Sequence, residues 1–189
     1  GADTLSQFLF DPTTGKLVAN EKPFVRTAEG AGPRHFAFSP DGKYVFLINE
    51  LDDTLSSYGF DASKGRLTWL QTLSTLPEGA DGAHNTCAEV VVAPSGDFVY
   101  GSNRGDDSIA TFALDAHSGK LRFLGTTPSG GAVPRSFTLS PDGRWMLVAN
   151  ESGNVTTFAV DVAHGSLRRV RTLPLDGKPQ FVGWALIPQ

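Results

Sequence analysis

GPRHFAFSPDGKYVFLINE, residues 32–50, predicts a β-strand, a tight turn and a second β-strand. The turn is Ser-Pro-Asp-Gly at 39–42, in which proline presets φ at about −65°, aspartate can bond its own backbone and glycine accepts a positive φ. The segment at 43–48 is aromatic and β-branched, which favours a pleated and mostly buried strand. Strands joined by so short a turn run antiparallel, so the stretch predicts one hairpin.

The register of this hairpin brings two charged residues together. If Ser39 lies opposite Lys43, Arg34 falls opposite Ile48. Arg34 and Glu50 are therefore expected to emerge at the same end of the hairpin, away from the turn. This is the end at which we look for chemistry.

The same hairpin recurs twice along the chain. Pro40, Pro94 and Pro141 stand in turns of the same form, at spacings of 54 and 47 residues. Each second strand ends in asparagine, and a polar turn and a third strand ending at aspartate follow it. Four residues after that aspartate comes a glycine, and then a fourth strand. Asp11 and Gly15 show the same pattern at the start of the chain.

Four short strands in each unit of 47 to 54 residues are typical of β-propeller blades. A β-sandwich explains the alternation equally well but not the four-strand period. We therefore expect an all-β fold with almost no helix, a single partial β-propeller over 1–189. Its expected parts are strands three and four of one blade (1–32), three complete blades (33–86, 87–133 and 134–180) and the first strand of a closing blade (181–189).

Three complete blades and two partial ones do not close a ring comfortably, since propellers have typically about 4–8 blades. An open stack leaves strand edges and apolar blade faces exposed. The pattern therefore predicts the C-terminal half of a larger propeller. The alternatives are closure with a second copy of the chain or with a separate N-terminal fragment.

The composition argues against several partners. The 189-residue chain carries a formal net charge of −4, and its basic residues cluster only at 168–171, so nucleic acid is not an expected partner. Cys87 is the only cysteine, which rules out an intrachain disulfide and a cysteine metal site and fits a reducing compartment. No run of about 18 apolar residues is present, so no membrane contact is expected. We expect a cytoplasmic protein that uses no metal or cofactor.

The hairpin geometry applies to every blade, and it predicts a charged mouth at one end of the propeller. Equivalent positions at the start of the inner strands hold Arg34, Ala88 and Arg135, and those after the second strands hold Glu50, Arg104 and Glu151. The long loop at 76–86 ends at the same mouth and carries His84, and His35 directly follows the first arginine.

Such a mouth suits an anionic, oxygen-rich ligand. Arginine can clamp a carboxylate or phosphate through two parallel hydrogen bonds, and it can stabilise charge that develops on a carbonyl oxygen. Glu50 can activate water as a general base. No Gly-x-Ser-x-Gly elbow is present, so a serine nucleophile is not indicated.

Each of these residues also has a structural interpretation. Arg34 with Glu50, and Arg135 with Glu151, can be ion pairs that lock adjacent strands. Arg104 stands where its counterparts are acidic, which favours a function. The two histidines have plain alternatives as well: His35 can point into the blade, and His84 can simply be exposed on its glycine-rich loop.

Three blocks of the chain carry a family resemblance: GPRHFAFSPDGKYVFLINEL, TCAEVVVAPSGDFVYGSNRGDDSIATFALD and PRSFTLSPDGRWMLVANE. Together they resemble the lactonase family of seven-bladed propellers, and the resemblance covers essentially the whole chain. That family includes bacterial 6-phosphogluconolactonases and a fungal muconate-lactonising enzyme. The terminal FVGWALIP resembles the family's last strand, so the chain would make up about half of a seven-bladed ring.

The resemblance implies a lactonase that hydrolyses 6-phosphogluconolactone, a small anionic sugar lactone, in the pentose phosphate pathway. It implies a site of arginines, a glutamate and a histidine, of which the histidine belongs to an earlier blade that this chain does not contain. Arg34, Glu50 and Arg104 match the motif and are expected to be catalytic. The residues expected to bind substrate are Arg135, His35, His84 and Glu151.

Two other functions remain open on this reasoning. The mouth residues fit a non-catalytic propeller scaffold that binds a protein or a small anion. They equally fit a lactonising, cycloisomerase-type reaction on an unsaturated dicarboxylate, because arginines suit two carboxylates as well as one phosphate.

Overall fold

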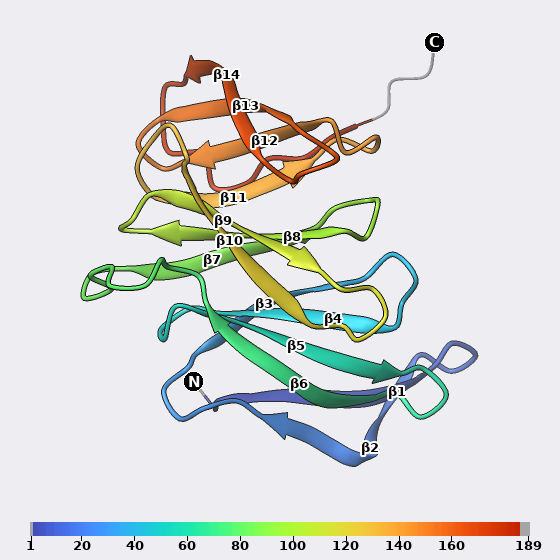
Figure 1. Ribbon diagram of the computed structural model, residues 1–189. Coiled ribbons are helices and arrows are strands. Elements are labelled where there is room, and N and C mark those ends of the chain that lie inside the picture. The colour runs from blue at the N-terminus through green and yellow to red at the C-terminus, as the bar shows by residue number, and fades with distance from the viewer. Residues whose placement is uncertain (1, 186–189) are drawn as a thin grey trace.

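The computed structural model describes residues 2–185, and this part of the chain consists of strands and loops without a helix (Figure 1). A two-stranded sheet comes first, and three four-stranded sheets follow it, each an antiparallel meander. The all-β, four-stranded architecture expected from the repeat is confirmed. Within residues 2–185 no helix is long and apolar enough to cross a membrane.

The strands follow the repeat closely. The two-stranded sheet contains β1 (Thr4–Asp11) and β2 (Lys16–Arg26). The first four-stranded sheet contains β3 (Pro33–Phe38), β4 (Tyr44–Asn49), β5 (Thr54–Asp61) and β6 (Arg66–Ser74). The second contains β7 (Thr86–Val92), β8 (Phe98–Arg104), β9 (Ser108–Leu114) and β10 (Leu121–Pro128). The third contains β11 (Pro134–Leu139), β12 (Trp145–Asn150), β13 (Asn154–Val160) and β14 (Leu167–Pro174).

The sheets are stacked face to face, from β1–β2 at the blue end of the chain to β11–β14 at the orange end (Figure 1). Their inner strands β3, β7 and β11 contact one another in that order. Apolar side chains fill the space between sheets: Phe46, Ile48 and Phe112 are fully buried between the first and second complete blades, and Tyr100 and Phe158 between the second and third. Burying rings of this size is the main apolar contribution to the stack.

The register expected for the first hairpin is wrong by one residue. His35, not Arg34, lies opposite Ile48, because the turn between the strands is one residue longer than assumed. A β-bulge between Pro33 and His35 then leaves Arg34 as an extra, unpaired residue. Arg34 and Glu50 nevertheless lie at the same end of the hairpin, as expected, because the bulge occurs at the start of β3, away from the turn.

The aspartate–glycine pattern marks the turn between the third and fourth strands of every sheet. In these turns the aspartate Oδ1 accepts the backbone N–H two residues later at 2.9 or 3.0 Å, and the glycine at the fourth position has φ between 61° and 74°. Only glycine adopts this left-handed backbone without strain. Side-chain hydrogen bonds, supported by backbone N–H groups, hold the pKa of all four carboxyls below the usual range; the aspartates are Asp11, Asp61, Asp115 and Asp161.

We expect the folded state to lose stability as the pH falls below about 4. Asp41 shows the cause most clearly, since the Ser39 hydroxyl at 2.7 Å, aided by Lys43, lowers its pKa to about 2. A carboxyl with a lowered pKa binds fewer protons folded than unfolded, so its contribution is present above the unfolded pKa and is lost as the pH falls through the folded value. Urea midpoints measured from pH 6 to 2 should decline, and Asp41→Asn should flatten the decline. A midpoint independent of pH in this range would contradict the prediction.

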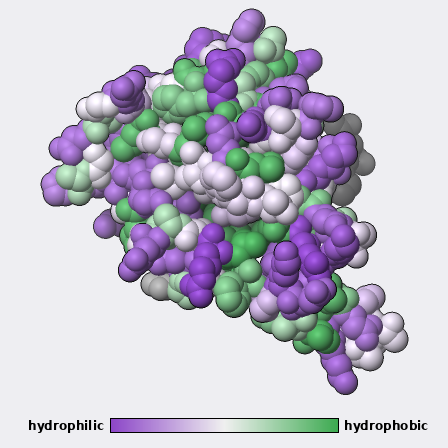
Figure 2. Space-filling view, turned by 60° about the horizontal axis from the view of Figure 1, so that its bottom comes forward, coloured by the Kyte–Doolittle hydropathy of each residue, from purple (hydrophilic) through white to green (hydrophobic). Residues whose placement is uncertain are grey.

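The sheet of β1 and β2 has the aspartate–glycine turn that each larger sheet has between its third and fourth strands. Beside it lies a groove of about 450 Å³ whose apolar lining includes Phe8, Phe36 and Phe38, all of them exposed. Figure 2, which turns the lower side of Figure 1 forward, shows hydrophobic surface between polar patches. At the other end of the chain, residues 181–185 form no strand, contrary to the first strand expected at 181–189, and the remaining residues of that segment lie outside the described part.

Candidate active site

A bulge at the start of every inner strand sets the directions of the mouth side chains. The ladder is interrupted between Pro33 and His35 in β3, between Cys87 and Val90 in β7 and between Pro134 and Ser136 in β11. Bulges re-aim side chains and are frequent next to active sites. Here they occur at the three equivalent positions that hold Arg34, Ala88 and Arg135.

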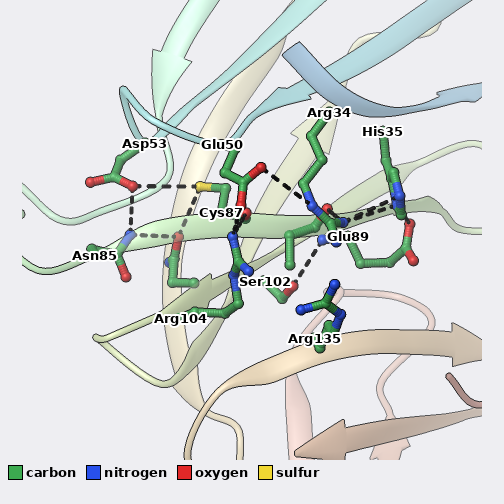
Figure 3. A network of polar contacts seen from close by, with 12 residues as sticks. Arg34, His35, Glu50, Asp53, Asn85, Cys87, Glu89, Ser102, Arg104 and Arg135 are labelled. Atoms are coloured by element: carbon green, nitrogen blue, oxygen red, sulfur yellow. Dashed lines mark hydrogen bonds and ion pairs between the residues drawn. The ribbon is translucent and has the colours of Figure 1, made fainter. Parts of the chain in front are cut away.

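Glu50 lies between two arginines (Figure 3). Its Oε2 is 3.7 Å from Arg34 Nε, and its Oε1 accepts a hydrogen bond from Arg104 Nη2. Both guanidinium groups are also bound to the backbone of β7: Arg34 Nη1 donates to Ala88 O at 2.6 Å, and Arg104 Nη2 to Cys87 O at 2.8 Å. The arginine side chains are 15% and 13% exposed, so this cluster is largely buried.

The cluster contains more positive charge than one carboxylate neutralises. Burial, and after it repulsion from Arg104 and Arg135, lowers the pKa of Arg34 against the opposing effect of Glu50. Arginine stays protonated in spite of such shifts. Arg104 Nε is in addition buried without a hydrogen-bond partner among the described residues. Paired arginines with spare donors can hold an anion or stabilise a developing oxyanion.

Arg135 and Glu151 repeat the pairing one blade later. Arg135 Nη1 donates to Glu151 Oε1 at 3.1 Å, and the arginine is 38% exposed. Its guanidinium points toward the cluster of Arg34 and Arg104 (Figure 3). This more open position suits a group that first meets a ligand's charge, and the structure thus brings all five expected arginine and glutamate positions together.

His35 lies in the cluster, and it has a partner that sequence reasoning missed. Its Nδ1 is 2.9 Å from Glu89 Oε1, and Arg34 Nη1 is 3.3 Å from both ring nitrogens. Glu89 occupies in β7 the repeat position that His35 occupies in β3, which was the available clue. Ala88, which precedes it, breaks the series of mouth arginines, so that series does not point to Glu89.

The structure does not bring His84 into the cluster. The side chain is exposed on the loop between β6 and β7 and makes none of the hydrogen bonds or ion pairs found within residues 2–185. The backbone of this loop does pack at the mouth, since a Cβ on Gly105 would lie 2.5 Å from His84 O. The position of the loop predicts His84 as a ligand group, but it is the backbone of the loop that packs at the mouth, not this side chain.

A buried polar network lies beneath the mouth, next to Arg104. Asn103 Oδ1 accepts from Thr75 Oγ1 at 2.7 Å. Asp53 Oδ1 accepts from Asn85 Nδ2 at 2.8 Å (Figure 3). Cys87 Sγ is 3.4 Å from Asn103 Oδ1, and burial raises the pKa of Cys87 to about 12. Burial also raises the pKa of Asp53. No three metal-binding side chains converge anywhere in the described part of the chain.

We expect the Cys87 thiol to be unreactive in the folded protein. It is 0% exposed, and with a pKa of about 12 only about one thiol in 10⁴ is thiolate at pH 8. A chromogenic disulfide reagent should therefore release almost no thiolate from native protein at pH 8 and one equivalent per chain in urea. Rapid reaction of the native chain would contradict this prediction.

The comparison with known protein families decides where the chain belongs. The family model described as "Lactonase, 7-bladed beta-propeller" matches residues 1–184. The chain belongs to this lactonase family. The resemblance seen in its three sequence blocks is thereby confirmed.

Relatives of known structure or name support the same family. A 6-phosphogluconolactonase of Formosa agariphila is 33% identical over 174 residues, which cover 90% of this chain and 48% of that protein. The structure of a periplasmic gluconolactonase of Pseudomonas aeruginosa is 34% identical and matches with a TM-score of 0.91, covering 100% of this chain and 52% of that one. A putative 6-phosphogluconolactonase of Bacteroides fragilis is 28% identical with a TM-score of 0.84, covering 95% of this chain and 51% of that one. This member of the lactonase family spans about half the length of these relatives.

Proposed function

We propose that this chain carries the mouth residues of a lactone hydrolase that converts 6-phosphogluconolactone to 6-phosphogluconate. The observation that carries the proposal is the sharing of the Glu50 carboxylate between Arg34 and Arg104 at the mouth of a lactonase-family propeller. A carboxylate beside two arginines supplies both a base for water and positive charge for an oxyanion.

In the proposed reaction Glu50 takes a proton from water while the water oxygen attacks the lactone carbonyl carbon. Arg34 and Arg104 stabilise the negative charge on the carbonyl oxygen. The bond between the carbonyl carbon and the ring oxygen then breaks, and the ring oxygen takes the proton from Glu50. The product is an open-chain acid, which releases its proton to water. Glu50 returns to its ionised form.

Arg135, paired with Glu151, is proposed to bind the phosphate of the substrate. It is the most exposed of the three arginines, and its bond to Glu151 at 3.1 Å can be exchanged for a bidentate contact with phosphate. We also propose that the reaction serves the pentose phosphate pathway in the cytoplasm. Relatives named 6-phosphogluconolactonase support the pathway, and the single cysteine is consistent with the compartment.

The test is hydrolysis of 6-phosphogluconolactone and of gluconolactone by the 189-residue chain, each compared with the uncatalysed rate. Faster hydrolysis of the phosphorylated lactone, with a KM that rises only for that lactone in Arg135→Ala, supports the proposal. Equal rates with and without folded protein would overturn it for this chain. A folded Arg34→Ala variant with unchanged turnover would assign the arginines to structure instead.

We further propose that more blades complete the ring, from an N-terminal half or from a second copy. The groove beside β1, with Phe8, Phe36 and Phe38 exposed, supports this proposal, because an unpaired edge next to apolar surface is open to further strands. Native mass spectrometry distinguishes the two sources. A dimer at micromolar concentration supports the second copy, and a monomer counts against it.

A further inference from the structure

The pair of His35 and Glu89 joins two inner strands next to the arginine cluster. His35 belongs to β3 and Glu89 to β7, and their side chains are 45% and 18% exposed. Glu89 is fixed at both ends, since its backbone N–H donates to Ser102 Oγ at 3.0 Å and its Oε1 accepts from Val90 N at 3.2 Å. The carboxylate is therefore a rigid acceptor directed at the imidazole (Figure 3).

The Glu89 carboxylate determines where the imidazole proton lies. A proton on Nδ1 can be donated to Glu89 Oε1, 2.9 Å away, whereas a bare Nδ1 would set its lone pair against the carboxylate. The hydrogen bond made by one ring nitrogen determines which tautomer is present. A neutral ring with the proton on Nδ1 keeps a lone pair on Nε2, and Arg34 Nη1, which is 3.3 Å from both ring nitrogens, can then donate only to Nε2.

Arg34 needs support of this kind because its position is electrostatically unfavourable. Arg104 and Arg135 repel it, and Glu50 is 3.7 Å from Arg34 Nε, while the same carboxylate accepts a direct bond from Arg104. Its firm contacts are made by Nη1, to Ala88 O at 2.6 Å and to the His35 ring. Arg34 Nη2 makes none of the hydrogen bonds found within residues 2–185 and is left for a ligand.

We infer that Glu89 and His35 are positioning residues, in which Glu89 fixes the imidazole and the imidazole braces Arg34 so that Nη2 stays available to an anionic oxygen. The proposed function contributes only the identity of that oxygen, the carbonyl oxygen of the lactone. The contacts of Glu89 with His35 and of His35 with Arg34 belong to the described residues, and their effect can be measured without turnover.

The first measurement is ¹⁵N NMR of the histidine rings in the full chain at pH 8.5, with His35 assigned by its loss in His35→Gln. The expected signal has the proton on Nδ1, and Glu89→Gln should move it toward Nε2, since the glutamine amide can donate to Nδ1. Glu21→Gln is the matched control, because Glu21 also pairs with an arginine, Arg66, and leaves His35 untouched. A proton on Nε2 in the unaltered chain would overturn the inference.

The second measurement is the affinity for inorganic phosphate by titration calorimetry, with every variant made in an Arg135→Ala background so that phosphate binding reports on Arg34 and Arg104. His35→Phe and Glu89→Gln should weaken phosphate binding about tenfold with unchanged melting temperatures, as expected when one charge-assisted contact is loosened. His35→Gln should keep most of the phosphate affinity that His35→Phe loses, because the glutamine amide can both donate to Glu89 and accept from Arg34. Equal phosphate affinity in Arg135→Ala with and without His35→Phe would overturn the inference. Absence of hydrolysis with the His35 tautomer intact would instead count against the proposed reaction alone.

Discussion

Replacing Glu50 with glutamine is expected to slow hydrolysis of 6-phosphogluconolactone by about 10²- to 10⁴-fold, the range lost with a general base. Glutamine has nearly the same shape and can still accept a hydrogen bond from Arg104, but it cannot take a proton from water. Initial rates at saturating lactone, corrected for the uncatalysed reaction, provide the measurement. The loss should fall on kcat, since the proposed base acts in the bond-forming step.

The matched control is Glu21→Gln, which removes a carboxylate from an ion pair with Arg66 on the outer strands. Glu21 is 83% exposed, and such a surface pair contributes little to stability, so both rate and melting temperature should stay unchanged. A Glu50→Gln variant that keeps its turnover but melts at a clearly lower temperature would show that the carboxylate only neutralises Arg34 and Arg104. That outcome would favour the scaffold function over the hydrolase.

Much of the architecture can be predicted from local chemistry that recurs. Proline, aspartate and glycine at fixed offsets specify turns through their own backbone preferences, so the hairpin at 32–50 and its two repeats were identified correctly. The same holds for the turns that start at aspartate, where a side chain caps the backbone two residues away. Such features depend on short segments and are therefore visible in the sequence.

The finer geometry of the site depends on contacts between blades, which no local pattern specifies. The bulge that leaves Arg34 unpaired interrupts the ladder between β3 and β4, and the alternation of side chains in β3 alone does not specify it. Glu89 becomes part of the site only because β7 places it against His35. His84 shows the converse, since a loop can end at the mouth while its histidine side chain remains exposed.

Replacing Asn103 with alanine is expected to lower the free energy of unfolding by about 3 kcal/mol or more. This loss is larger than the loss expected at Asn49, the equivalent asparagine one blade earlier. Asn103 is 0% exposed, and its Nδ2 donates to Thr75 O at 3.1 Å and to Ser108 Oγ at 3.2 Å, while its Oδ1 accepts from Thr75 Oγ1. Thr75 is also fully buried, so water cannot take over these bonds. Each unsatisfied buried group costs about 1–3 kcal/mol.

Asn49 is the matched comparison, because it occupies the same place one blade earlier. Its Nδ2 bonds only within its own sheet, to Thr54 Oγ1 at 2.8 Å and Ser56 Oγ at 3.4 Å, and its Oδ1 already lacks a partner. Asn49→Ala should therefore cost about 1 kcal/mol in urea unfolding. The difference between the two losses of unfolding free energy measures the hydrogen bonds between Asn103 in β8 and Thr75 in the loop that precedes β7. Equal losses would mean that this loop is held by its backbone alone, and that the buried network does not fix the mouth beside Arg104.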